Sequence, residues 1–256
     1  SSFSIHAQDS IKKPKIGLVL SGGGAKGLAH IGVLKVIDSL NIKIDYIGGT
    51  SMGAIVGGLY ASGYSADDLE LLFSKIDTDA LIQDYIPRNS KAFNQKRNDE
   101  VYIIALPFKN FKISAPTGLS KGMYNFNLLS RYTYHVKEIR DFSKFKIPFI
   151  CIATDIETGK DAVLKEGILS QAIVASGAIP SLYYPVEMDG KLLVDGGVSN
   201  NYPVEYLREM GADIVIGVDV QDGLLTRDNL KGITDVLIQI SNFPTDQKTN
   251  ENIKLT

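Results

Sequence analysis

Ser51 has the sequence surroundings expected of an activated nucleophile. It lies in Gly49-Thr50-Ser51-Met52-Gly53, after the short apolar run Tyr46-Ile47-Gly48 and before the helix-like run 54–59. This order predicts a strand, a sharp turn and a helix, which together expose the serine hydroxyl at the carboxyl end of the strand. The helix N-terminus behind it stabilises negative charge. The predicted chemistry is attack on an acyl ester with a covalent intermediate.

A glycine-rich loop, Gly22-Gly23-Gly24-Ala25-Lys26-Gly27, follows one predicted strand and opens a helix. It matches the G-x-G-x-x-G pattern, so a dinucleotide-binding oxidoreductase is one interpretation. That class needs an acidic residue at the carboxyl end of the second strand, whereas Asp45 begins this strand and glycines end it. A Walker loop also fails, because Lys26 precedes Gly27 and no Lys-Ser or Lys-Thr pair follows.

The same loop suits an oxyanion hole. Neighbouring strands end at the same edge of a sheet, so the glycine loop and the Ser51 turn would face one cleft. The N–H groups of Gly23 or Gly24, together with that of Met52, could then reach the oxyanion formed by attack of Ser51. Lys26 opposes the helix dipole at this position, so it predicts either a carboxylate partner or a solvated side chain.

The histidines are poorly placed to activate Ser51. A Ser-His-Asp triad of the α/β-hydrolase kind needs a histidine after the acid, but no histidine follows position 135. His30 lies on the apolar face of the first predicted helix, which is typical of a core or interface residue. His135 ends an aromatic-rich helix and is expected at the periphery.

Carboxylates follow three of the predicted strands, at Asp155, Asp195 and Asp219. Each could accept the serine proton, and each could equally cap a neighbouring turn. An aspartate with the ordinary pKa of about 3.9 is a weak base, so the role needs partial burial and a short hydrogen bond. Asp195 is narrowly favoured, because the glycines of Gly196-Gly197 let another backbone approach closely.

Composition bounds the class of protein. At 256 residues and 44% hydrophobic content, the chain suits one large α/β domain, and a formal net charge of −2 does not indicate a nucleic-acid partner. Cys151 is the single cysteine, which excludes an internal disulfide. The histidines at 6, 30 and 135 lack zinc-ligand spacing, so no metal and no cofactor is expected.

The chain contains no apolar run of about 18 residues, so the sequence predicts no segment that spans a bilayer. Residues 1–12 are interpreted as a disordered N-terminus or the remnant of a signal peptide. Export to the periplasm or outer membrane is therefore slightly favoured over a cytoplasmic location.

Hydrophobic periodicity predicts alternating strands and helices, and this order is typical of an α/β fold with a parallel sheet. Residues 77–147 interrupt the alternation and are interpreted as a lid-like insertion. The predicted elements are strands at 16–20, 45–49, 148–153, 191–194 and 214–218, helices at 52–62 and 170–176, a capping box at 65–68, a hairpin turn at Asp189-Gly190 and a final helix near 230–240.

Within the insertion, residues 101–108 and 111–114 flank Lys109-Asn110 like a β-hairpin. Residues 123–136 form a predicted helix with an apolar stripe, which suits a lipid surface or, more commonly, core or dimer packing. From Pro244 onward the chain is polar, so residues 244–256 are predicted to be loosely attached.

Three blocks together resemble the signatures of patatin-like phospholipases: residues 22–27, residues 49–53 and Asp195-Gly196-Gly197. Residues 153–155 and 175–180 are also similar to intermediate blocks of that family. The resemblance implies a three-layer α/β/α domain over 13–243 with a mostly parallel central sheet. Lys26 stands where many members have arginine.

The resemblance further implies a metal-independent acyl hydrolase with a Ser-Asp dyad, of the phospholipase A or lysophospholipase type. Ser51 would be the nucleophile, Asp195 the base and Gly22 to Gly24 the oxyanion hole. A lipid or fatty-acyl ester is the expected substrate, and peripheral membrane contact and homo-oligomers are compatible with it. The resemblance favours an exported bacterial member, a kind that can be joined to an outer-membrane barrel. A noncatalytic lipid-binding module is the alternative from another class.

Overall fold

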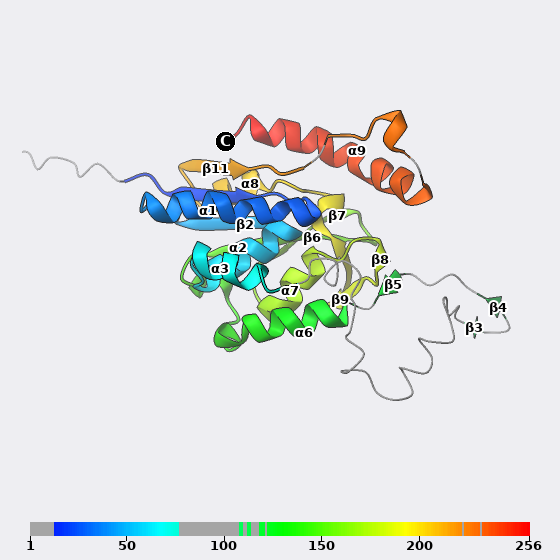
Figure 1. The fold of residues 1–256 in the computed structure, drawn as a ribbon, viewed down its shortest axis with the longest axis horizontal. Coiled ribbons are helices and arrows are strands. Elements are labelled where there is room, and N and C mark those ends of the chain that lie inside the picture. Colours follow the sequence, from blue (N-terminus) through cyan, green and yellow to red (C-terminus); the bar gives the residue numbers. More distant parts are fainter. Residues whose placement is uncertain are drawn as a thin grey trace, which may run out of the picture.

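A mixed seven-stranded sheet forms the centre of the computed structural model (Figure 1). The structure describes residues 13–76, 108–109, 112–113, 118–120, 122–221, 223–230 and 232–256. The strand order is β11-β1-β2-β6-β10-β9, and β7 pairs with β6 outside this path. The strands are β1 Ile16–Leu20, β2 Tyr46–Thr50, β6 Phe149–Asp155, β7 Lys160–Leu164, β9 Val186–Met188, β10 Lys191–Asp195 and β11 Ile214–Val218.

Four neighbouring strands of the sheet, β11, β1, β2 and β6, run parallel. The pairs β6–β7, β6–β10 and β10–β9 are antiparallel. The predicted hairpin turn at Asp189-Gly190 is confirmed, since it joins β9 to β10 and its two residues have φ values of 52° and 73°. Positive φ at both central residues is the geometry that matches the twist of the flanking strands.

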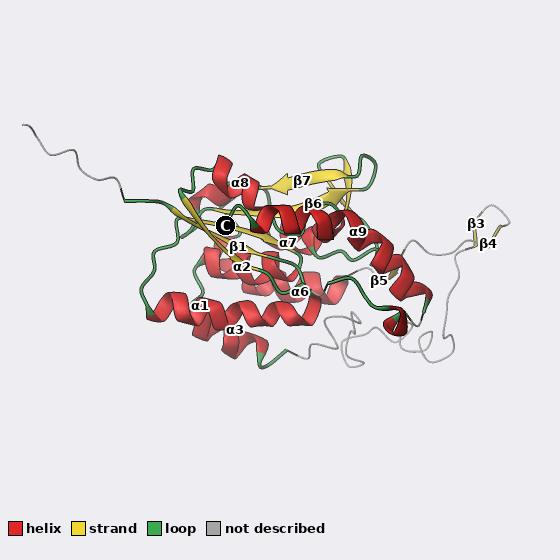
Figure 2. Ribbon diagram, turned by 90° about the horizontal axis from the view of Figure 1, so that it is seen from above, coloured by secondary structure: helices red, strands yellow, loops and turns green. Residues whose placement is uncertain are grey.

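Helices cover both faces of the sheet (Figures 1 and 2). Along β1, Leu18 and Leu20 pack into the larger apolar cluster, whereas Val19 packs into the smaller cluster on the opposite face. The three-layer α/β/α expectation is therefore confirmed. The larger cluster's side carries α1 Ala29–Ser39, α2 Met52–Ser62, α3 Ala66–Phe73, α6 Met123–Tyr132 and α7 Leu169–Ser176, and the other side carries α8 Val204–Glu209 and α9 Ile233–Ile253.

Shorter elements connect these layers. Strand β3 (Phe108–Lys109) pairs antiparallel with β4 (Lys112–Ile113), so a hairpin is present, but Lys109 pairs with Lys112 as a strand residue, whereas the sequence predicted it in the turn. Residues 1–12 and 77–107, with most of the lid-like insertion, lie outside the described residues. The remaining short elements are β5 Gly118–Ser120, which pairs parallel with β8 Ser181–Tyr183, and the 3₁₀ turns η1 Gly24–Leu28, η3 Tyr134–Val136, η4 Phe142–Lys144, η5 Gly196–Val198 and η6 Arg227–Asn229.

Two predicted helices begin where the sequence indicated. The capping box opens α3, since the Ser65 hydroxyl accepts from the Asp68 N–H and the Asp68 carboxylate accepts from the Ser65 N–H. Helix α6 begins at Met123, as predicted, but ends at Tyr132, and the separate turn η3 follows. Leu129 of α6 is buried and Met123 is exposed, so this helix contributes to the interior. Its contact with a lipid surface stays a prediction.

The C-terminal segment differs from its prediction. Residues 244–256 were expected to be loosely attached, but α9 continues to Ile253, and Thr245, Thr249 and Asn252 on this helix are buried. Polar side chains hold this helix to the rest of the domain. The prediction was wrong because it relied on apolar periodicity, which this polar stretch lacks. Although α9 has 21 residues, no described helix is both long and apolar enough to cross a bilayer.

Candidate active site

Strands β2 and β10 meet end to end along one edge of β6. Strand β7 pairs with residues 151–155 of β6 from one edge, so β2 and β10 must share the other. The parallel strand β2 ends with Thr50 opposite Ile152, and the antiparallel strand β10 ends with Asp195 opposite Ala153. The carboxyl ends of two strands distant in sequence therefore meet beside consecutive residues of β6.

Ser51 follows Thr50 directly and precedes the first turn of α2. Its φ is 54°, a left-handed conformation that costs a non-glycine residue on the order of 1–3 kcal/mol. The surrounding structure holds this turn, since the Ser51 N–H donates to Ser176 Oγ at 2.9 Å and the Ser51 carbonyl accepts from the N–H groups of Ala54 and Ile55. The predicted strand, sharp turn and helix are thus confirmed.

The Ser51 hydroxyl donates a hydrogen bond to Asp195 Oδ2 at 2.7 Å. The other carboxylate oxygen, Oδ1, accepts from the Gly197 N–H at 2.7 Å. The main-chain carbonyl of Asp195 accepts from Thr154 Oγ1 at 2.9 Å. The structure therefore brings together the two residues that the sequence indicated as nucleophile and base, across 144 positions.

Burial sets the basicity of Asp195. Only 7% of the residue is exposed, and removal from water raises the pKa of its carboxyl to about 6. The hydrogen bonds from Ser51 and Gly197 favour the charged form and oppose this shift. A carboxyl group with this pKa is ionised at neutral pH, and it accepts a proton more readily than an ordinary aspartate does.

The other two candidate carboxylates cap turns. Asp155 accepts from the Glu157 N–H and the Thr158 hydroxyl in the turn after β6. Asp219 accepts from the N–H and the side chain of Gln221 after β11. The sequence left open that Asp155 and Asp219 cap neighbouring turns, and the structure shows both of them doing so.

His30 and His135, the two histidines within the described residues, also bond to main-chain carbonyls away from Ser51. His30 is fully buried, with Nε2 at 2.8 Å from the Ser21 carbonyl oxygen, and burial lowers its pKa despite this bond. His135 Nε2 lies 3.1 Å from the Ser62 carbonyl oxygen. Neither imidazole bonds to the dyad, as the spacing indicated.

Gly22 has a role different from the predicted one. Its N–H donates to Asn201 Oδ1 at 3.0 Å, and Asn201 Nδ2 donates back to the Gly22 carbonyl at 3.2 Å. Because its N–H is engaged, the prediction of Gly22 as an oxyanion donor is wrong in this structure. Asn201 instead ties the glycine-rich loop to the segment that follows Asp195.

Three predicted oxyanion donors remain available. Within the described part of the chain, the N–H groups of Gly23, Gly24 and Met52 form no hydrogen bond to a protein acceptor. Gly24, Met52 and Ser51 line the same cavity. Backbone N–H groups beside the nucleophile are the donors that acyl-transfer sites use to stabilise developing negative charge.

Close packing explains the supporting glycines of the signature blocks. A side-chain carbon at Gly53 would collide with the Leu20 carbonyl, and one at Gly196 would collide with the Ile152 carbonyl. Gly49 packs on the backbone of α2 and Gly27 packs on Met52. Lys26 is exposed in η1, and its expected carboxylate partner stays a prediction.

An apolar cavity opens beside Ser51, between α2, α3, α6 and the segment after α7. None of its described lining residues carries a charged side chain, so the cavity suits a hydrocarbon chain. No group of three metal-ligating side chains occurs among the described residues. The cavity is lined by Gly24, Ala25, Ser51, Met52, Ile55, Leu72, Phe73, Ile76, Asn125, Leu128, Leu129, Tyr132, Gly177, Ile179, Leu182 and Tyr183.

Sequence reasoning missed Ser176 and Thr154, which bond to the main chain of the dyad residues, and Asn201, which holds the glycine-rich loop. Ser176 and Thr154 lie within the two intermediate blocks, so their place in these blocks was the available signal. Asn201 follows the Asp195 block by a few positions and carries no comparable signal. Its function depends on the tertiary contact with Gly22.

Comparison with known proteins agrees with this architecture. The family model described as patatin-like phospholipase matches residues 18–208. The chain is 32% identical over 206 residues to lysophospholipase nte1 of Emericella nidulans, and 34% identical over 211 residues to lysophospholipase NTE1 of Cryptococcus neoformans. Each match covers 80% of this chain but only 12% and 11% of the relative.

These two relatives are fungal, so they do not support the expected bacterial kind of member. The crystal structure of VipD from Legionella pneumophila shares the fold, with a TM-score of 0.53 at 17% identity over 89% of this chain and 53% of that one. The family match covers well over half of the chain. The chain belongs to the patatin-like phospholipase family.

Proposed function

We propose that this chain hydrolyses acyl esters of lipids, with Ser51 as the nucleophile and Asp195 as the general base. The 2.7 Å hydrogen bond between their side chains is the observation that carries the proposal. The relatives named lysophospholipase support a phospholipid or lysophospholipid as the substrate.

In the acylation step, Ser51 Oγ attacks the ester carbonyl carbon while Asp195 Oδ2 accepts the hydroxyl proton. The carbonyl oxygen becomes an oxyanion, which the N–H groups of Gly23, Gly24 and Met52 are available to stabilise. When the tetrahedral intermediate collapses, the bond to the alcohol oxygen breaks. Asp195 returns its proton to that oxygen, and an acyl-enzyme remains on Ser51.

In the deacylation step, Asp195 takes a proton from water and the resulting hydroxide equivalent attacks the acyl carbon. The second tetrahedral intermediate expels Ser51 Oγ, which recovers a proton from Asp195. The products are a free fatty acid and the regenerated dyad. The apolar cavity beside Ser51 offers the acyl chain a site away from water.

The dinucleotide-binding alternative gains no support from the geometry. Asp45 lies directly before β2 and accepts from the N–H of Ile16, the first residue of β1, so it is at the opposite end of these strands from the glycine-rich loop. The Gly22 N–H, which would face a pyrophosphate, is bonded to Asn201. The noncatalytic lipid-binding alternative is separated from hydrolysis by the experiment below.

The decisive experiment is labelling with a fluorophosphonate probe, combined with turnover of a soluble fatty-acyl ester. The wild-type chain should be labelled, whereas Ser51→Ala should lose labelling and at least about 10³-fold in kcat. Asp195→Asn should lose a similar factor in kcat. Ser39→Ala is the matched control, because Ser39 is an exposed serine at the end of α1.

Retained ester turnover in Ser51→Ala would refute the assignment of the nucleophile. A wild-type chain that binds lipid vesicles but neither reacts with the probe nor releases fatty acid would favour the noncatalytic module. Sedimentation with phospholipid vesicles at low and high salt tests the peripheral membrane contact that the proposal also expects.

A further inference from the structure

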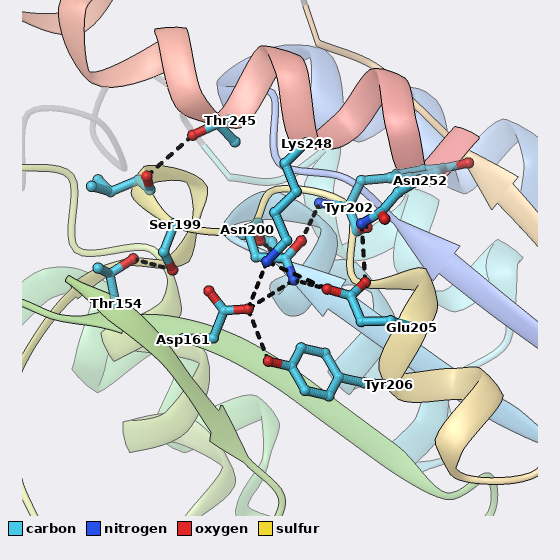
Figure 3. A network of polar contacts seen from close by, with 12 residues as sticks. Thr154, Asp161, Ser199, Asn200, Tyr202, Glu205, Tyr206, Thr245, Lys248 and Asn252 are labelled. Atoms are coloured by element: carbon cyan, nitrogen blue, oxygen red, sulfur yellow. Dashed lines mark hydrogen bonds and ion pairs between the residues drawn. The ribbon is translucent and has the colours of Figure 1, made fainter. Parts of the chain in front are cut away.

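Helix α9 packs on the domain with a polar stripe. Thr245, Lys248, Thr249 and Asn252 recur at the spacing of one helix face. Thr245, Thr249 and Asn252 are only 2%, 4% and 7% exposed. Figure 3 shows Thr245, Lys248 and Asn252 directed from the helix toward the loop that contains Ser199 and Asn200. A face that is polar yet buried must be satisfied by specific partners.

Thr245 bonds to the turn that orients the catalytic carboxylate. Its hydroxyl lies 2.8 Å from the Gly197 carbonyl oxygen and 3.1 Å from that of Val198. The N–H of the same Gly197 donates to Asp195 Oδ1, and Asp195 Oδ2 accepts from Ser51. A short series of contacts therefore runs from α9 through η5 to the nucleophile.

Lys248 and Asn252 fix the same helix to two other elements. The Lys248 ammonium lies 3.0 Å from Asp161 on β7 and 3.4 Å from Glu205 on α8. Asn252 Nδ2 lies 2.8 Å from the Tyr202 carbonyl and 3.0 Å from Glu205 Oε2. These contacts set the position of α9 independently of Thr245 (Figure 3).

We propose that Thr245 is a positioning residue of the Ser51–Asp195 dyad, so that full activity depends on the docked helix α9. The inference rests on the hydrolase function proposed above. Thr245 touches no reacting atom. It bonds to the Gly197 carbonyl, which lies in the peptide group next to the one whose N–H donates to Asp195, and so it restrains the Gly197 backbone that presents this N–H.

The test is Thr245→Val, which keeps the shape of the side chain and removes its hydroxyl. Thr249→Val is the matched control, because Thr249 is equally buried one turn away on α9 but bonds to Gln221 rather than to η5. Thr245→Val should lower kcat for a soluble ester about two- to tenfold, the range of one hydrogen bond, with KM unchanged within about twofold. Thr249→Val should keep the wild-type kcat, and Thr245→Ser should restore it.

The pH profile gives a readout that a purely structural role would not move. The Gly197 N–H favours the charged form of Asp195, so weakening this bond raises the pKa of Asp195 and moves the acid limb of kcat/KM to higher pH. Ser51, from the β2–α2 turn, and Gly197, from η5, are the described groups whose bonds shift this pKa against burial, and no charged side chain is among them. A ¹³C NMR titration of the Asp195 carboxyl measures the same shift without turnover.

Two failures are distinguishable. If the wild-type chain neither hydrolyses esters nor reacts with a fluorophosphonate, the proposed function itself fails. If the wild type is active and Thr245→Val has the same kcat and acid limb as Thr249→Val, only the positioning role of Thr245 fails. Thermal unfolding and circular dichroism of all three variants establish that the folded forms are being compared.

Discussion

The two faces of the central sheet support the active site in different ways. On the α2 side, Ser51 leads into a helix of which nine of eleven residues are buried, most of them small or apolar, within the larger apolar cluster. On the α8 and α9 side, the smaller apolar cluster is supplemented by a hydrogen-bonded network around the loop that follows Asp195 (Figure 3).

This difference indicates a division of tasks. Apolar packing supplies stability but is not directional, whereas hydrogen bonds fix the direction of individual peptide groups. The nucleophile therefore depends on a well-packed helix, and the base depends on polar contacts made by residues far from the reacting atoms. Changes on the polar face should mainly affect turnover, and changes on the apolar face should mainly affect stability.

Among changes outside the dyad, the largest effect on turnover is expected from Asn201→Ala, on the polar face. This change removes both bonds to Gly22 and frees the glycine-rich loop, so kcat should fall about 10- to 100-fold, below the full loss of an oxyanion donor. Asn229→Ala, in the exposed turn η6, is the control. Steady-state kinetics with a soluble ester measures both, and equal kcat values would contradict the proposed division.

An intermediate effect on turnover is expected when the pH is lowered, because Asp195 then becomes protonated. Burial raises the pKa of Asp195 to about 6, and a general base stops working when it is protonated. Activity should therefore be lost as the pH falls through about 6, with kcat/KM about tenfold below its plateau at pH 5. The measurement uses an ester without ionisable groups. An acid limb near pH 4 would mean that the carboxyl acting as base is not buried.

The smallest effect on turnover is expected from Leu59→Ala, on the apolar face. Leu59 of α2 is fully buried, so its truncation should lower the free energy of unfolding by about 2–5 kcal/mol. The kcat per fluorophosphonate-reactive site should stay within about twofold of wild type. Leu71→Ala on α3 is the exposed control, with 57% of Leu71 accessible. A kcat loss as large as that of Asn201→Ala would show that the faces do not differ.

Ser51 could be predicted from the sequence because local patterns encode it, whereas Asp195 was only narrowly favoured over Asp155 and Asp219 by its own surroundings and was singled out by the family resemblance. Glycines around Ser51 and after Asp195 mark places where the backbone turns sharply or approaches another strand. Asp195 directly follows an apolar run, and two residues separate Ser51 from one. The mostly parallel sheet followed from the alternation of strands and helices. These signals act over a few residues, whereas the choice among the three carboxylates depends on which strand end lies beside Ser51 in the fold.

What the sequence did not reveal depends on contacts between distant polar groups. Gly22 matched the motif of an oxyanion donor, but the amide of Asn201, 179 positions away, engages its N–H. The polar stripe of α9 lacked the apolar period by which packed helices are recognised, and a proline at position 244 is typical of a helix end. Hydrophobic patterning cannot register a helix that is held by hydrogen bonds.

Because β2 and β10 end beside consecutive residues of β6, this strand sets the distance between Ser51 and Asp195. Loops between positions 51 and 195 that lie outside β6 can change length without moving the two side chains apart. The pairing of β2 and β10 with β6 sets the distance between them. One residue inserted between Ile152 and Ala153 would separate the strand ends by about 3.3 Å and turn the remainder of β6 over. The chain can therefore vary its surface freely, whereas the middle of this one buried strand tolerates no change in length.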